Sequence, residues 1–178
     1  MSKIYHFRVL IDYNDADVFR DIEISDGNTF EEFHIAIQKA FKFDNKQMAS
    51  FFMSNDAWDK GQEITLMAMD FDDGSTSVYM SETKINDMVS KAGQKLVYVF
   101  DFMVMWCFFI ELVKISKPEK SKKYPCVVKE YGDAPEQYSK KVKIKPEDDK
   151  YLLKNIDVSA DSPSDDIFEG FDDFEQYH

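Results

Sequence analysis

The feature that most restricts the fold is a nearly unbroken apolar run from Leu96 to Val113. A helix that spans a membrane needs about 20 such residues, so the run raises a transmembrane alternative. Asp101 interrupts the run, Glu111 lies near its end, and β-branched and aromatic side chains dominate it, as they do in strands. We therefore predict two buried strands, at 95–102 and 106–115, and no membrane segment.

The first 24 residues alternate in polarity, which is the period of half-buried strands. Residues 14–17 read Asn-Asp-Ala-Asp and predict a turn between two such strands. The residues expected to share a face are Tyr5, Phe7, Val9 and Ile11 in the first strand, and Val18, Arg20, Ile22 and Ile24 in the second. The pattern predicts a β-hairpin.

A helix is predicted to begin after Thr29. Thr29 and Glu32 have the spacing of a capping box, in which each side chain accepts a hydrogen bond from the backbone of the other residue. Apolar residues then recur every three or four positions, at Phe30, Phe33, Ile37, Ala40 and Phe41. This stripe should pack on the inner face of the hairpin.

The middle of the chain predicts shorter elements. Strands are expected at 48–54 and 63–69, and a second short helix is expected with Thr83 as its cap. Gly93 stands where a left-handed C-terminal cap is often needed. The buried stripe of this helix would be Ile85, Met88, Val89 and Ala92. Together these elements predict an α+β fold: a hairpin, a helix and further, mostly antiparallel strands.

With 178 residues, the chain has the length of one ordinary domain, and 44% hydrophobic residues are enough for a real core. We assign the folded domain to 1–145, where 142–144 has the pattern of an additional edge strand. Residues 146–178 form an acidic tail with scattered aromatic side chains, which we predict to be disordered. Two cysteines are too few for a disulfide framework and the N-terminus has no secretory apolar run, so we expect a cytoplasmic protein.

The net charge of −12 is unevenly distributed: −9 for 1–113, +6 for 114–145 and −9 for 146–178. The basic block could bind the phosphates of a nucleic acid, or its lysines could be ordinary loop residues. The chain holds only two arginines, which disfavours readout of bases, and its overall charge repels DNA. The candidate polyanion-binding residues are Lys120, Lys122, Lys123, Lys140 and Lys141.

Three phrases of the chain carry a family resemblance. The first is the helix start Thr-Phe-Glu-Glu-Phe-His at 29–34, which leads to Ala-Phe-Lys-Phe-Asp at 40–44, and the second is Val-Phe-Asp-Phe-Met-Val-Met-Trp at 99–106. Both resemble the plasmid pRiA4b ORF-3-like family, whose members often occur near plasmids and mobile elements. The matching residues are His34, Asp44, Asp101, Phe102 and Trp106. The family's glycine and paired aspartates are replaced by Met103, Val104 and Met105.

A third phrase, Tyr-Pro-Cys at 124–126 followed by Gly-Asp-Ala-Pro-Glu at 132–136, is similar to a proline-rich segment of the family. The resemblance covers roughly residues 3–138. It implies an α+β fold that begins as hairpin, helix and strand, and it implies no reaction. The lost aspartates imply that any ligand they bind in other members is not bound here, and that the segment serves as apolar core or interface.

Candidate catalytic residues are few. His34, Asp44 and Asp101 would support an enzyme of unknown reaction if they met in one pocket, but a structural histidine is the commoner case. The sequence Asp-Phe-Asp-Asp-Gly at 70–74 superficially resembles a calcium loop, yet Ser81 stands where a bidentate glutamate is needed. Cys107 and Cys126 lack the spacing of a zinc site. We therefore expect no metal and no cofactor.

The leading hypothesis is a non-catalytic protein-interaction module. Its acidic tail would engage an unknown protein partner, or would dock on the lysines of the same chain, through Phe168, Phe171 and Phe174. The tail could equally be an extension that only keeps the protein in solution. The alternative from another class is a nucleic-acid-associated accessory protein whose tail regulates access to the lysine-rich segment 114–145. A third is the enzyme of unknown reaction.

Overall fold

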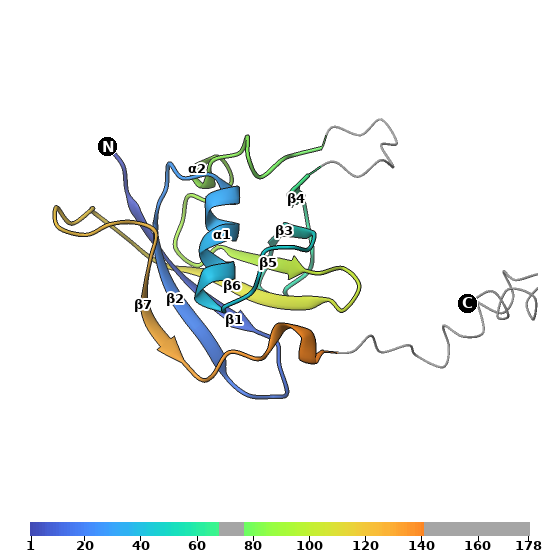
Figure 1. The fold of residues 1–178 in the computed structure, drawn as a ribbon. Helices are drawn as coiled ribbons and strands as arrows, with labels where there is room; N and C mark the ends of the chain where they lie inside the picture. The colour runs from blue at the N-terminus through green and yellow to red at the C-terminus, as the bar shows by residue number, and fades with distance from the viewer. Residues whose placement is uncertain (68–76, 141–178) are drawn as a thin grey trace, which may run out of the picture. The chain divides into compact units, whose positions relative to one another are not determined.

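A seven-stranded sheet, antiparallel at every pairing of neighbouring strands, forms the frame of the protein in the computed structural model, which describes residues 1–67 and 77–140 (Figure 1). These residues lie in one compact unit, Met1–Lys141. The strand order is β4-β3-β5-β6-β1-β2-β7. The elements are β1 (Ile4–Ile11), β2 (Val18–Ser25), α1 (Phe30–Ala40), β3 (Ala49–Ser54), β4 (Glu63–Thr65), α2 (Ile85–Met88), β5 (Lys95–Phe100), β6 (Trp106–Ser116), β7 (Cys126–Tyr131) and the 3₁₀ turn η1 (Gln137–Ser139).

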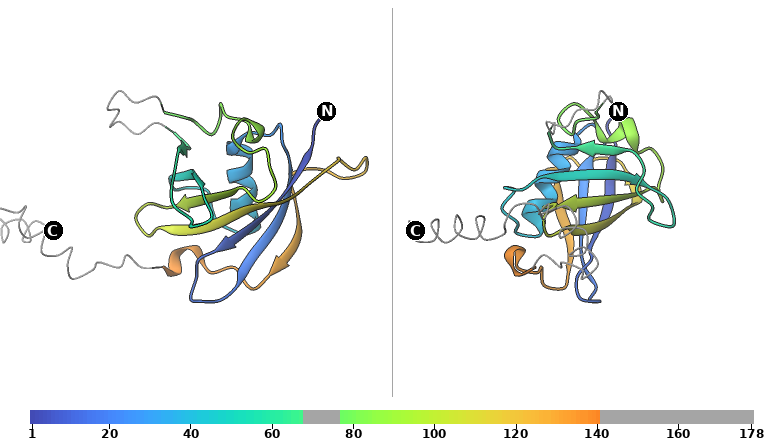
Figure 2. Two further views of the ribbon diagram at one scale, coloured as in Figure 1. Left: turned by 180° about the vertical axis from the view of Figure 1, so that it is seen from behind. Right: turned by 90° about the vertical axis from the view of Figure 1, so that its right-hand side faces the viewer.

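Helix α1 lies against one face of the sheet and creates the core, as the two further views in Figure 2 make clear. Phe33 of α1 is fully buried and stacks on Phe7 of β1 and Phe51 of β3, with ring centroids 4.6 and 5.3 Å apart. Burial of each such ring stabilises the fold by roughly 1.5–3 kcal/mol. The sheet and α1 are therefore held together mainly by aromatic packing.

The predicted hairpin, α1 and the two long strands are confirmed. The capping box of α1 is formed, because Glu32 N donates to Thr29 Oγ1 and Thr29 N donates to the Glu32 carboxylate.

The buried face of the hairpin includes Arg20, which is only 4% exposed. Its guanidinium donates to the carbonyl oxygens of Ala40, Phe19, Tyr131 and Gly132. Arg20 thereby ties the end of α1 and the end of β7 to β2.

Several expectations were wrong in detail. The 63–69 strand is shorter than predicted, because β4 ends at Thr65. Thr83 does not cap α2: its hydroxyl donates to Tyr79 O, and α2 begins after Lys84. Ala92 is exposed, so it adds nothing to a buried stripe. Gly93 does adopt a left-handed conformation, with φ of 92°, but it serves the turn into β5 rather than the end of α2.

Strand β7 was missed by the sequence analysis. It pairs with β2 at the edge of the sheet, and five of its six residues are exposed, so it lacks the alternation that marks a half-buried strand. The possible strand at 142–144, the calcium-like phrase at 70–74 and the acidic tail lie outside the described residues.

The fold class is best stated as a mostly antiparallel seven-stranded sheet with little helix, so the α+β expectation holds only in this coarse form. Within the described ranges, no helix is long and apolar enough to cross a membrane.

Candidate functional site

His34 sits inside a closed network of buried polar groups between α1 and β5. Its Nδ1 lies 2.6 Å from Tyr98 Oη, and its Nε2 contacts Asn45 Oδ1. Gln38 Nε2 donates to the same Tyr98 oxygen at 2.8 Å, and Gln38 Oε1 accepts from Asn45 N. Burial raises the pKa of Tyr98, so its hydroxyl stays protonated and donates a hydrogen bond to His34 Nδ1. His34 is thus the Nε2–H tautomer and donates to Asn45.

The same burial lowers the pKa of His34, against a smaller opposing effect of the hydrogen bond with Asn45. A neutral imidazole with both nitrogens paired and no exposed surface has neither a free lone pair nor access to a substrate. His34 therefore has a structural role, because it satisfies polar groups that α1 and β5 bring into the core.

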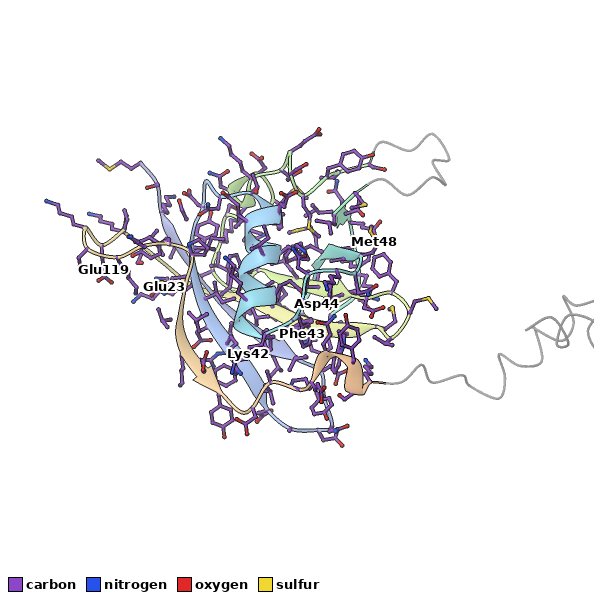
Figure 3. All side chains as sticks on the ribbon, in the orientation of Figure 1. Glu23, Lys42, Phe43, Asp44, Met48 and Glu119 are labelled. Carbon is purple, nitrogen blue, oxygen red and sulfur yellow. The ribbon has the colours of Figure 1, made fainter. Side chains whose placement is uncertain are left out.

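Asp44 acts as a clamp on the segment that follows β7. Its backbone N–H donates to Gln137 Oε1 at 2.7 Å, and its carboxylate accepts from Gln137 Nε2 at 3.0 Å. The carboxylate also accepts from the hydroxyl of Tyr138, and this bond is the main reason why the pKa of Asp44 is lowered. Trp106 Nε1 donates to Gln137 O at 3.0 Å. Asp44, labelled in Figure 3, and Trp106 therefore hold η1 in place together.

Asp101 shapes the turn between β5 and β6. Its φ is +60°, its Oδ1 accepts from Met103 N at 3.1 Å, and its carbonyl accepts from Met105 N. Val104 packs partly against the core, whereas Met103 and Met105 are 75% and 42% exposed. The replacement of the family's polar turn thus leaves two methionines in solvent rather than in the core.

The three candidate catalytic residues do not converge. Among the described residues, the hydrogen-bond partners of His34 are Tyr98 and Asn45, and neither Asp44 nor Asp101 joins that network. Asp44 and Asp101 are related only through Tyr138, whose pKa both carboxylates raise, Asp44 more strongly. We call His34, Asp44, Asp101 and Trp106 the motif residues, because the family resemblance rests on them, together with Phe102. Each of them has an identifiable role in holding the fold.

A cluster around Glu23 was not found from the sequence. His6 Nδ1 lies 2.9 Å from Glu23 Oε1, and His6 Nε2 lies 2.7 Å from Ser116 Oγ. This is the order of groups in a hydrolase triad. However, Glu23 is also paired with the ammonium of Lys122, and Ser116 does not line the hollow of about 160 Å³ that lies beside His6.

The Glu23 cluster instead fastens the loop between β6 and β7 to the sheet. Glu23 is 6% exposed, and its second oxygen holds Lys122 of that loop, whose pKa it raises. Figure 3 labels Glu23 on the sheet and Glu119 on the loop. One signal could have revealed part of the cluster: the hairpin register places His6 directly opposite Glu23. Ser116 and Lys122 come from distant parts of the sequence and gave no such signal.

The candidate polyanion-binding lysines that the structure describes belong to two separate segments of the chain. Lys120, Lys122 and Lys123 belong to the β6–β7 loop, and Lys122 is engaged by Glu23. Lys140 follows η1, and its ammonium lies over the Trp106 ring and donates to Met105 O. In Figure 1 the orange segment that contains η1 lies apart from the β6–β7 loop. Lys141, Phe168, Phe171 and Phe174 lie outside the described residues.

A groove of about 230 Å³ runs between α1 and the edge strand β7, and we call it the edge groove. The side chains of Ile35 and Ala36 on the outward side of α1 are only half-buried, and Val127 of β7 is 38% exposed. The edge groove is lined by Ile22, Glu32, Ile35, Ala36, Lys39, Pro125, Cys126 and Val127. The groove therefore offers an apolar floor beside a strand that has a neighbour on one side only in the described part of the sheet.

The charges around the edge groove favour an acidic ligand. Glu32 is committed to the helix cap, where Asn28 and the Thr29 backbone lower its pKa, and Glu130 lies 3.9 Å from the buried Arg20. Lys39, which lines the groove, is exposed, and so is Lys123, two residues before the lining residue Pro125. Neither of these lysines has an ion-pair partner within the described parts of the chain. Glu32 keeps its negative charge in the helix cap, so Lys39 is the lining charge in the described structure that remains available to a ligand.

Comparisons with known proteins agree with this fold. A solved structure of a protein of unknown function from Methanosarcina mazei Go1 is similar, with a TM-score of 0.68 and 22% sequence identity, over 89% of this chain and 83% of that one. No curated protein matches the chain. Residues 3–143 match the family described as Plasmid pRiA4b ORF-3-like protein. The chain therefore belongs to the plasmid pRiA4b ORF-3-like family.

Proposed function

We propose that the protein is a non-catalytic interaction module that binds a partner protein by adding a strand of that partner to β7. The observation that carries the proposal is the edge strand itself, whose outer side has no neighbouring strand in the described sheet. Val127, Val128 and Tyr131 expose 38%, 46% and 53% of their surface on it. Natural proteins usually protect such an edge, because its free N–H and C=O groups pair readily with another chain.

The edge groove supplies what strand addition needs for specificity. In this mode of recognition, main-chain hydrogen bonds provide affinity and side-chain pockets beside the strand select the ligand. Ile35 and Ala36 of α1 would receive apolar side chains from one face of the added strand. The motif residues support a non-catalytic role, because their polar groups are engaged in the His34 network and in the clamp on η1. The two free thiols, Cys107 and Cys126, are compatible with the cytoplasmic location that we propose.

The test is selection of binders from a random library of displayed peptides, using the full-length protein. Ala36→Glu places a charge in the apolar floor of the groove, and Ala92→Glu makes the same change at an exposed site outside it. We expect peptides with apolar and acidic residues that bind wild type and Ala92→Glu but lose at least tenfold in affinity for Ala36→Glu. Binders that tolerate both changes equally, or no enriched peptides at all, would refute binding at this groove.

A further inference from the structure

We infer that the edge groove is occupied in the free protein by a segment of the same chain, 165–175, which competes with the partner. The inference rests on the proposed function, since it concerns the ligand and the regulation of the same groove. It also draws on three independent features: the chemistry of the groove, the composition of the segment and the length of chain that joins them.

The segment has the chemistry that the groove requires. Its sequence is Asp-Asp-Ile-Phe-Glu-Gly-Phe-Asp-Asp-Phe-Glu, so six of its eleven residues are acidic, and the chain from 155 to 178 contains no lysine or arginine. In an extended strand, successive side chains point to opposite faces. Ile167 and Phe171 would then share one face, and Phe168 and Phe174 would share the other. Either face presents two large apolar groups to Ile35 and Ala36.

The charges of the two partners are complementary. Glu32 of the groove lining is bonded into the helix cap, and Glu130 of β7 lies beside Arg20. Lys39 is the exposed cation of the lining, and Lys123 lies two residues before the lining residue Pro125. The six carboxylates of the segment would meet these lysines, whereas an uncharged apolar peptide would leave them unused. Such exposed pairs are screened by salt, so they would contribute selectivity and rate of association more than affinity.

The length of the chain permits the contact. The described structure ends at Lys140, and 24 residues separate it from Asp165. An extended chain spans up to about 3.3 Å per residue, or roughly 80 Å in total. A domain of this size has a radius of gyration of about 14 Å, so the segment can reach the groove from any exit point. A tethered ligand has an effective concentration near ~1 mM and would lower the apparent affinity for an external ligand about tenfold when its own Kd is ~0.1 mM.

The experiment uses the full-length protein and a fluorescein-labelled synthetic peptide with the sequence of residues 163–176. The tail variant, Phe168→Ser with Phe171→Ser and Phe174→Ser, removes the apolar groups of the tethered segment. The matched control, Tyr151→Ser with Leu152→Ser and Leu153→Ser, removes three apolar groups elsewhere in the tail. We expect the tail variant to bind the peptide about tenfold more tightly than wild type or the control, and Ala36→Glu to abolish binding.

Equal affinity of wild type and the tail variant would overturn the inference, because the tethered segment would then not compete. Failure of the peptide to bind any of the proteins, or binding that Ala36→Glu leaves intact, would overturn it as well. In each of these cases, the proposed function is tested separately by the peptides selected from the random library. If those still require an intact groove, the interaction module stands and only its internal ligand is wrong.

Discussion

The two flanks of α1 differ in how their polar groups are used. On the side of β5 and the segment after β7, His34, Tyr98, Gln38 and Asn45 satisfy one another, and Asp44 is bonded to η1. On the side of β7, the helix presents Ile35 and Ala36 to a groove, and the strand next to it is exposed. His34 and Asp44 lie on the first side and hold the fold, whereas the groove on the second side is lined in part by Pro125 and Cys126 of the third family-like phrase.

The largest effect is expected from Tyr98→Phe. The loss of its hydroxyl leaves His34 Nδ1 and Gln38 Nε2 unpaired in the core, and each unpaired buried group costs about 1–3 kcal/mol. We expect the free energy of unfolding to fall by about 2–4 kcal/mol in urea denaturation. The matched change Tyr131→Phe on the exposed edge strand should alter it by less than about 0.5 kcal/mol. Equal losses would show that the two sides do not differ as described.

Ala36→Glu should produce the reverse pattern. The side chain is half-buried at the groove, and glutamate forms helices almost as well as alanine, so the free energy of unfolding should change by less than about 0.5 kcal/mol. Affinity for a peptide selected on wild type should fall at least tenfold, which corresponds to about 1.4 kcal/mol. Thermal unfolding and fluorescence titration measure the two quantities on the same sample. A large loss of stability would instead show that Ala36 helps to hold the fold.

Asp44→Ala should cost less than Tyr98→Phe, because its bonds to Gln137 and Tyr138 are near solvent. We expect about 1 kcal/mol in the free energy of unfolding, kept small by competition from water. Faster hydrogen exchange of the backbone amides of η1 should accompany it. If exchange in η1 stays unchanged, Asp44 does not clamp that segment.

The smallest effect expected is a change of stability with pH. Burial lowers the pKa of His34 in the folded state, so on acidification below its ordinary value of about 6.5 the unfolded chain takes up a proton that the folded chain does not. The contribution of neutral His34 to the free energy of unfolding is therefore fully present above about pH 6.5 and is lost as the pH falls. Wild type should lose stability between about pH 7 and 5.5 in urea denaturation, and His34→Gln should lose less. Parallel curves for the two proteins would contradict a neutral His34.

The sequence predicted most of the elements that bury one face. Alternation predicted β1 and β2, the spacing of Thr29 and Glu32 predicted the start of α1, and the apolar run predicted β5 and β6. Strand β7 was not predicted, because an exposed edge strand has no buried face that would make its residues alternate in polarity. The short helix was placed correctly, but the role assigned to Thr83 was wrong, since its hydroxyl bonds to Tyr79 O instead.

The site was harder to predict than the fold, because its partners are distant in sequence. His34 is 64 residues from Tyr98, and Asp44 is 93 residues from Gln137, so local spacing could not show that both motif residues were already paired. The edge groove depends on β7 lying beside α1, and that follows only from the pairing of β7 with β2. Sequence patterns report local periodicity and caps, whereas a groove arises from the order of strands.

The most direct test of this division between the two flanks is a titration of one peptide, selected on wild type, against Ala36→Glu and Asp44→Ala under conditions where both variants are folded. We predict that Asp44→Ala binds within about twofold of wild type, whereas Ala36→Glu loses at least tenfold, because the motif residues hold the fold and the edge groove binds the ligand. The opposite result, with binding lost in Asp44→Ala and kept in Ala36→Glu, would place the functional surface at the motif residues and contradict the division.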